Sequence, residues 1–201
     1  MKINCGNIVL RDLKFEDIDN LVRWHTVDDE WMDWDAPWEK DDPFDAVAYR
    51  AKQLEYIAKP KDENRTRYGF QLEYEGCHIG WVNSYKIDEN YNYAVDGWLA
   101  IGIDICEPDK WGKGIGRKAY AAFINYLFSC GYNELYTQTW SGNERMIRMA
   151  ERIGFRLCHR DVGVRQVNGH VYDRVTMKIA AKFWFCSGID KTADVVYNSQ
   201  Q

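Results

Sequence analysis

The stretch from Trp98 to Arg117 constrains the fold of this chain more than any other. Its first part alternates strictly, as a half-buried strand does, with four large aliphatic side chains on one face: Leu99, Ile101, Ile103 and Ile105. Glycines at 112, 114 and 116 come next, and a helical pattern follows them, with apolar side chains four residues apart at Ala119, Phe123 and Leu127. The stretch therefore predicts a strand, a tight loop and a helix in direct succession.

The glycine loop has the chemistry of an anion site. Glycine lets the backbone turn tightly and brings successive N–H groups close to a ligand. The N-terminus of the helix that follows adds partial positive charge, which favours anions. Basic side chains also surround the loop: Lys110, Lys113, Arg117 and Lys118. We predict that the loop binds a diphosphate group.

Length and composition indicate one soluble domain. A chain of 201 residues can bury a substantial core, and we expect one domain at 1–180 with a C-terminal tail of unknown role at 181–201. The six cysteines form no C-x-x-C pair, so neither a zinc site nor a disulfide framework is predicted. No apolar run approaches the roughly 20 residues of a membrane span, and a net charge of −5 argues against nucleic acid as partner. A cytoplasmic location is expected.

The remaining patterns predict an α+β fold. Strands are expected at 1–10, 68–74, 77–83, 135–140, 155–166 and 170–177, and helices at 15–26, 43–58 and 143–153. Together they predict a central, mostly antiparallel sheet of about seven strands, with one β-α-β crossover and helices on both faces. A dinucleotide-binding fold would need repeated crossovers, and the G-K-[ST] of a Walker loop is absent.

This combination resembles the GNAT family of acyl-CoA-dependent N-acetyltransferases. Trp111-x-x-Gly114-x-Gly116 matches the family's [QR]-x-x-G-x-[GA] loop except at its first position, and Asn143 through Gly154-Phe155 fits its second signature. One stretch is similar to the ribosomal-protein N-terminal acetyltransferase branch and another to aminoglycoside 6′-N-acetyltransferases. The resemblance implies acetyl-CoA as co-substrate, without a metal, and these cofactor contacts: Ile105, Cys106, Trp111, Gly112, Lys113, Gly114, Ile115, Gly116, Arg117 and Asn143.

The resemblance also implies candidates for the chemistry. Asp104, in the G-I-D context of the aminoglycoside branch, is the first candidate for the base that deprotonates the amine, and a solvated strand-end aspartate is the alternative. Glu107 is a lesser candidate. Ala150 stands where many members carry a tyrosine general acid, and Ser141 is a candidate replacement as proton donor.

An acidic segment at residues 28–45 lies where the family places its acceptor loops. It carries nine acids and one lysine, a local charge of −8, interleaved with tryptophans. Aromatic faces and carboxylates together suit an ammonium group, although a solvated loop with tryptophans packed on the core would show the same pattern. Contacts with the acceptor are predicted for Trp31, Trp34, Asp35 and Trp38.

We therefore expect direct transfer of an acetyl group to a primary amine. The acceptor is either a small cationic amine, aminoglycoside- or polyamine-like, or a protein or peptide N-terminus. The alternative, which Ala150 keeps open, is a catalytically silent acyl-CoA-binding or sensing module. The expected partners are the amine substrate and, as an option, a second copy of the chain.

Overall fold

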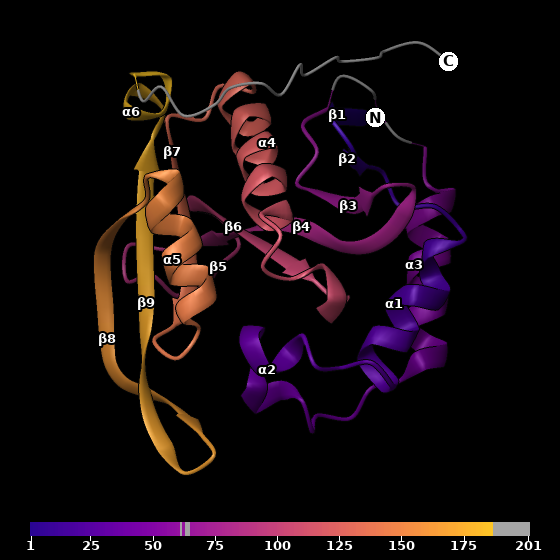
Figure 1. Cartoon of the computed structure of the whole chain (residues 1–201), viewed down its shortest axis with the longest axis horizontal. Coiled ribbons are helices and arrows are strands. Elements are labelled where there is room, and N and C mark those ends of the chain that lie inside the picture. The colour runs from indigo at the N-terminus through magenta and orange to yellow at the C-terminus, as the bar shows by residue number, and fades with distance from the viewer. Residues whose placement is uncertain (61, 63–64, 187–201) are drawn as a thin grey trace.

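The computed structural model describes residues 1–60, 62 and 65–186. Its strands form one sheet in the order β1-β2-β3-β4-β6-β7-β9-β8, and the short β5 pairs with β4 (Figure 1). The strands are β1 (Lys2–Cys5), β2 (Ile8–Arg11), β3 (Gly69–Tyr74), β4 (Cys77–Ile87), β5 (Tyr93–Ala94), β6 (Trp98–Ile105), β7 (Glu134–Trp140), β8 (Arg156–Val167) and β9 (His170–Ala180). The helices are α1 (Asp17–Thr26), α2 (Met32–Asp35), α3 (Ala46–Ala58), α4 (Ile115–Ser129), α5 (Glu144–Ile153) and α6 (Ala181–Cys186). Short 3₁₀ turns are η1 (Pro37–Glu39) and η2 (Pro108–Lys110).

The predicted α+β class and the single crossover are confirmed. Every pairing in the described sheet is antiparallel except that of β6 with β7, which α4 connects. The described part has nine strands rather than about seven. The expected first strand turns back on itself at Gly6, whose φ of +62° suits a tight turn, and β5 is a short additional strand ahead of β6.

Helices cover both faces of the sheet, as expected. Neighbouring residues of β4 point to opposite faces: Val82 packs in the large core with α4, and Trp81 packs in a second cluster with Leu21 and Trp24 of α1. The helix α3 begins later than predicted. Asp45, not Pro43, starts it, because the Asp45 side chain accepts hydrogen bonds from two backbone N–H groups of the first turn.

The strands β6 and β7 separate after a single register pair, Ala100 opposite Tyr136. Beyond that pair the carbonyl of Ile101 accepts hydrogen bonds from side chains, the Tyr120 hydroxyl at 2.7 Å and the Thr137 hydroxyl at 3.0 Å. These hydroxyls satisfy a buried backbone group that a continuous ladder would have paired. The separation opens the middle of the sheet.

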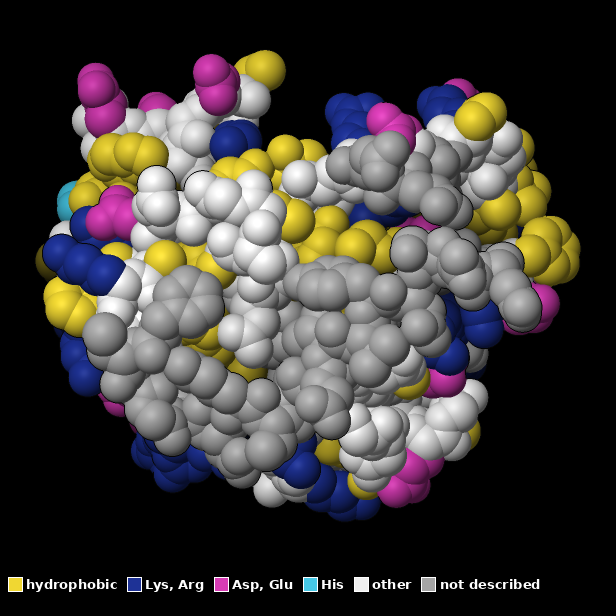
Figure 2. Space-filling view, turned by 90° about the horizontal axis from the view of Figure 1, so that it is seen from above, with side chains coloured by type: hydrophobic (Ala, Val, Ile, Leu, Met, Phe, Trp, Pro, Cys, Tyr) yellow, Lys and Arg dark blue, Asp and Glu magenta, His cyan; other side chains and the backbone are white. Residues whose placement is uncertain are grey.

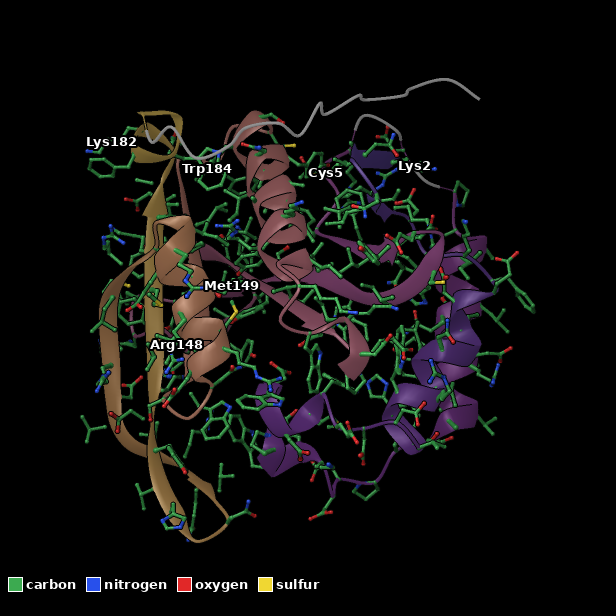
Figure 3. The ribbon with its side chains drawn as sticks, viewed as in Figure 1. Lys2, Cys5, Arg148, Met149, Lys182 and Trp184 are labelled. Atoms are coloured by element: carbon green, nitrogen blue, oxygen red, sulfur yellow. The ribbon has the colours of Figure 1, made fainter. Side chains whose placement is uncertain are left out.

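The chain continues past residue 180 into α6, which packs on α4. Trp184 is buried and points toward α4 (Figure 3), where its indole N–H donates to Asn125 Oδ1 at 2.5 Å. The packing therefore includes the first residues of the predicted tail; residues 187–201 lie outside the described part. Seen from above, on the side away from α2, both signs of charge surround a hydrophobic band (Figure 2). Among the described residues no helix is long and apolar enough to cross a membrane.

Candidate active site

A cavity of about 1140 Å³ occupies the opening between β6 and β7. Its walls come from α2, the end of β6, the glycine loop, the end of β7 and the start of α5. It brings together most of the residues singled out in the sequence: Trp31, Trp34, Asp35, Asp104, Ile105, Trp111, Gly112, Gly114, Ile115, Gly116, Arg117 and Asn143. Segments far apart in sequence thus meet at one site.

The glycine loop forms the end of the cavity where α4 begins. Gly112 and Gly114 have φ of +73° and +77°, in the left-handed region, and a Cβ on either would meet nothing within 4 Å. The backbone there is therefore open toward a ligand, and the N-terminus of α4 adds positive potential. Lys110 and Arg117 also line the cavity. This donor set fits a diphosphate; Lys113 lies outside the lining.

Trp111 stands where the family motif has a polar side chain, and the structure gives it another task. Its indole N–H donates to the carbonyl of Ile105 at 2.7 Å, which fixes the loop to the end of β6. The amide of Cys106 is not free to meet a cofactor, contrary to expectation, because it donates to the Ile79 carbonyl at 2.8 Å. Cys106 is fully buried, and burial raises the pKa of its thiol.

The start of α5 forms the opposite wall. Asn143 caps the helix, because its Oδ1 accepts from Met146 N at 3.0 Å, and its Nδ2 donates to the Trp34 carbonyl at 2.7 Å. Met149 points from α5 toward the start of α4 (Figure 3), where a Cβ on Gly116 would lie 3.4 Å from its sulfur. The two helix N-termini thus face one cavity, and both favour an anionic ligand.

Asp104 lies on β6 directly opposite Trp81 of β4. Burial raises the pKa of the Asp104 carboxyl well above its ordinary value, the Asp35 carboxylate raises it further, and a hydrogen bond from the Trp81 side chain opposes both. Asp104 lines the cavity. A carboxyl with a raised pKa is a stronger base than an ordinary one.

Asp35 faces the same cavity from the end of α2. It keeps contact with solvent in the open cavity, yet the surrounding protein raises its pKa to about 6, and the Glu39 carboxylate adds to that shift. Asp35 and Asp104 were predicted for separate tasks, one in acceptor binding and one in catalysis. The fold places them at one site, where the charge of each affects the other.

The tryptophans of the acidic segment have different surroundings. Trp31 is buried, and its indole N–H donates to the Trp24 carbonyl at 2.8 Å, so it is both a cavity wall and part of the second core cluster. Trp34 lines the cavity. Trp38 lies outside the lining, where the guanidinium of Arg165 on β8 lies 4.6 Å from the centre of its ring.

Two predicted catalytic side chains are not brought to the cavity. The Glu107 carboxylate accepts from Arg23 at 2.5 Å and from the Trp24 indole at 3.0 Å. The Ser141 hydroxyl accepts from the backbone N–H of Asp173 at 3.0 Å, which extends the pairing of β7 with β9. Both hold structure together. Ala150, where the family's tyrosine is missing, is fully buried.

Neither Trp81 nor Arg145 is among the site residues predicted from the sequence. Trp81 could have been found once its strand pairing was known, because it is opposite Asp104. Arg145 gave no such signal: its guanidinium carbon lies 3.8 Å from the ring centre of Trp34 and 4.7 Å from that of Trp111, residues remote in sequence. Among the described residues no group of three or more potential ligands could hold a metal ion.

Two proteins match parts of this sequence. A mycothiol acetyltransferase from Propionibacterium freudenreichii is 36% identical over 63 residues, which is 31% of this chain and 19% of that protein. An uncharacterized protein from Methanocaldococcus jannaschii is 21% identical over 75% of this chain and 28% of its own length. The chain therefore matches less than a third of either relative.

Solved structures share the fold over nearly all of their length. A Vibrio cholerae spermidine N-acetyltransferase in complex with CoA and spermine has a TM-score of 0.69 and 19% identity, covering 90% of this chain and 99% of that one. A ribosomal L7/L12 alpha-N-protein acetyltransferase in complex with coenzyme A has a TM-score of 0.69 and 15% identity, covering 90% and 98%. The family model for the acetyltransferase (GNAT) domain matches residues 7–156. Because that match covers well over half of the sequence, the chain belongs to the GNAT acetyltransferase family.

Proposed function

We propose that this protein transfers an acetyl group from acetyl-CoA directly to a cationic primary amine. The observation that carries the proposal is the placement of two carboxylates, Asp35 and Asp104, in the cavity that the glycine loop also lines. Family membership supports acetyl transfer. One similar structure holds CoA and spermine, and another, described as a ribosomal L7/L12 alpha-N-protein acetyltransferase, holds coenzyme A. The class of acceptor is therefore argued from this chain's own charges.

Two carboxylates facing one cavity favour a cation. In the absence of a cation, burial and repulsion by the Asp35 carboxylate keep the pKa of Asp104 well above normal. The two carboxyl groups are therefore not readily charged at the same time. A bound ammonium group makes this easier because it stabilises both anions. A lysine-like amine has a pKa of about 10.4 and reaches the site protonated. We infer that a small polyamine-like amine fits better than a neutral one, with a peptide N-terminus as the second option.

The proton on that amine must leave before the amine can attack. Asp104 is the proposed general base: it takes the ammonium proton, and its raised pKa makes that transfer less uphill. Acetyl-CoA supplies the activated acetyl group when bound. We propose that Gly112, Gly114, Arg117 and Asn143 hold it, through the loop backbone, the basic side chain and the start of α5.

Replacing Asp104 tests the proposal. We expect Asp104→Asn to lower kcat/KM by about 10²- to 10⁴-fold for spermidine or a short peptide amine, the usual contribution of a general base. Binding of coenzyme A, measured by calorimetry, should stay unchanged. Asp96→Asn, an exposed aspartate outside the cavity, is the matched control and should keep full turnover. Full activity of Asp104→Asn would refute the base assignment.

A silent acyl-CoA-binding module is the second candidate, favoured by the buried Ala150 at the tyrosine position. Thiol release from acetyl-CoA with a panel of polyamines, aminoglycosides and peptides separates the two. Coenzyme A binding without turnover for any amine would favour the silent module. We also propose one acetyltransferase domain over residues 1–180 and a cytoplasmic location. The second proposal rests on these cysteines, which are free: Cys5, Cys77, Cys106, Cys130 and Cys158.

A further inference from the structure

Arg145 is placed unusually for a cation at the start of a helix. It lies in the first turn of α5, where the helix dipole disfavours positive charge. Among the described residues it makes no ion pair, and its guanidinium carbon instead lies over two indoles, 3.8 Å from the ring centre of Trp34 and 4.7 Å from that of Trp111. Both distances are within cation–π range. The contacts with these rings, not the helix, account for its position.

The indole of Trp111 and the backbone of Trp34 are held by hydrogen bonds that do not involve Arg145. Trp111 belongs to the glycine loop, and its N–H donates to the Ile105 carbonyl at 2.7 Å. Trp34 belongs to α2, and its carbonyl accepts from the Trp140 indole at 2.8 Å and from Asn143 Nδ2 at 2.7 Å. The helix α2 is only four residues long and buries none of them, and these hydrogen bonds join it to the end of β7 and the start of α5. Arg145 adds a link from Trp34 of α2 to Trp111 of the loop.

We propose that Arg145 is a positioning residue that couples the glycine loop to the acidic segment, so that a ligand held by the loop also orders Asp35. Trp34 directly precedes Asp35, and both line the cavity with Trp111. A ligand that fixes Trp111 thereby fixes the guanidinium over it, and the guanidinium limits the movement of Trp34. The coupling is reciprocal, because binding free energies are linked. The effect of this coupling on the KM for the amine rests on the proposed function, whereas its effect on the order of Asp35 does not.

Hydrogen–deuterium exchange with coenzyme A as the probe tests the coupling in the intact chain. In the unmodified protein we expect coenzyme A to slow exchange of residues 112–117 and also of residues 31–39. In Arg145→Met, which keeps the length of the side chain and removes its charge, the slowing at 112–117 should remain and that at 31–39 should disappear. Arg145→Lys should restore part of it, since lysine keeps the cation–π contact without the flat guanidinium.

Steady-state kinetics gives a second measurement. We expect Arg145→Met to raise the KM for spermidine by about tenfold, the size of a lost cation–π contact, with a smaller change in the affinity for coenzyme A. Arg50→Met is the matched control, because Arg50 pairs with Asp19 on exposed helices outside the cavity. It should leave exchange and KM unchanged.

The possible outcomes are distinct. Slowing at 112–117 without slowing at 31–39 in the unmodified protein overturns the coupling and leaves acetyl transfer intact. Equal slowing at 31–39 in Arg145→Met does the same. Loss of coenzyme A affinity in Arg145→Met with unchanged slowing at 31–39 would make Arg145 a phosphate ligand instead. No slowing at 112–117 in the unmodified protein overturns the donor site of the proposed function and the coupling with it.

Discussion

Asp104 and Trp81 lie opposite one another on β6 and β4, and the Trp81 side chain donates a hydrogen bond to the Asp104 carboxylate. The pKa of Asp104 is therefore set by opposing effects: burial and the Asp35 carboxylate raise it, and the indole lowers it. Replacing Trp81 should therefore raise the pKa of Asp104, and replacing Asp35 should lower it.

Trp81→Phe should move the acid limb of the pH–rate profile upward. The indole N–H stabilises the charged carboxylate, so its removal raises the pKa of Asp104 further. The deprotonated base then accumulates only at higher pH, and kcat/KM should reach its plateau at a higher pH than in the unmodified protein. A profile of kcat/KM against pH measures this, and an unshifted limb would contradict the assigned hydrogen bond.

Asp35→Asn should move the same limb downward. Removing the Asp35 charge removes its repulsion, and the pKa of Asp104 falls toward its ordinary value. The KM for a polyamine should rise because one of the two carboxylates facing the acceptor is lost. Asp33→Asn is the control, since Asp33 lies on the same helix, outside the cavity, and pairs with Lys40. If both variants gave the same profile, Asp35 would not act on Asp104.

Gly114→Glu should abolish binding of coenzyme A. The side chain would enter the open space in front of the N-terminus of α4, and its negative charge would compete for the site of the phosphates. A residue other than glycine at φ +77° also costs about 1–2 kcal/mol of stability. Gly131→Glu has the same strain, at φ +94° with open space around it, but lies outside the cavity. Calorimetry should show binding in the second variant alone.

His78 should make the protein less stable in mild acid. Burial lowers the pKa of its imidazole from 6.5 to about 4, against the opposing effect of Asp17. Between pH 6.5 and 4 this imidazole is protonated in the unfolded chain and neutral in the folded one. The free energy of unfolding therefore falls as the pH drops from 6.5 to 4, by about 3 kcal/mol in total. Urea unfolding at a series of pH values measures the slope. His78→Gln should reduce it, and an unchanged slope would assign the effect to other groups.

The arrangement of elements was largely predictable because it depends on local patterns. Alternation identified β6, the glycine spacing identified the start of α4, and the strands expected at 155–166 and 170–177 are β8 and β9. The helix expected at 143–153 is α5, and Asn143 caps it. Each of these features depends on residues near one another in the chain, so the local sequence is enough to predict it.

The site was predictable only in part. The loop that lines the cavity was found through its glycines, but Glu107 and Ser141 looked equally available for chemistry. Their actual partners, Arg23 and the backbone of Asp173, come from elements that the sequence does not bring near them. A polar side chain shows its chemical capability in the sequence, whereas its availability depends on which partner the fold supplies.

The sequence by itself determined that this chain forms a strand, a glycine loop and a helix suited to a diphosphate, because backbone geometry and helix charge are local properties. Tertiary structure alone decided that Asp35 shares a cavity with Asp104 and that Trp81 forms a hydrogen bond with Asp104. It also decided that Arg145 contacts two indoles 77 residues apart in the chain. Burial and charge repulsion act through space. They exist only once β6 and β7 separate and α2 lies across the opening.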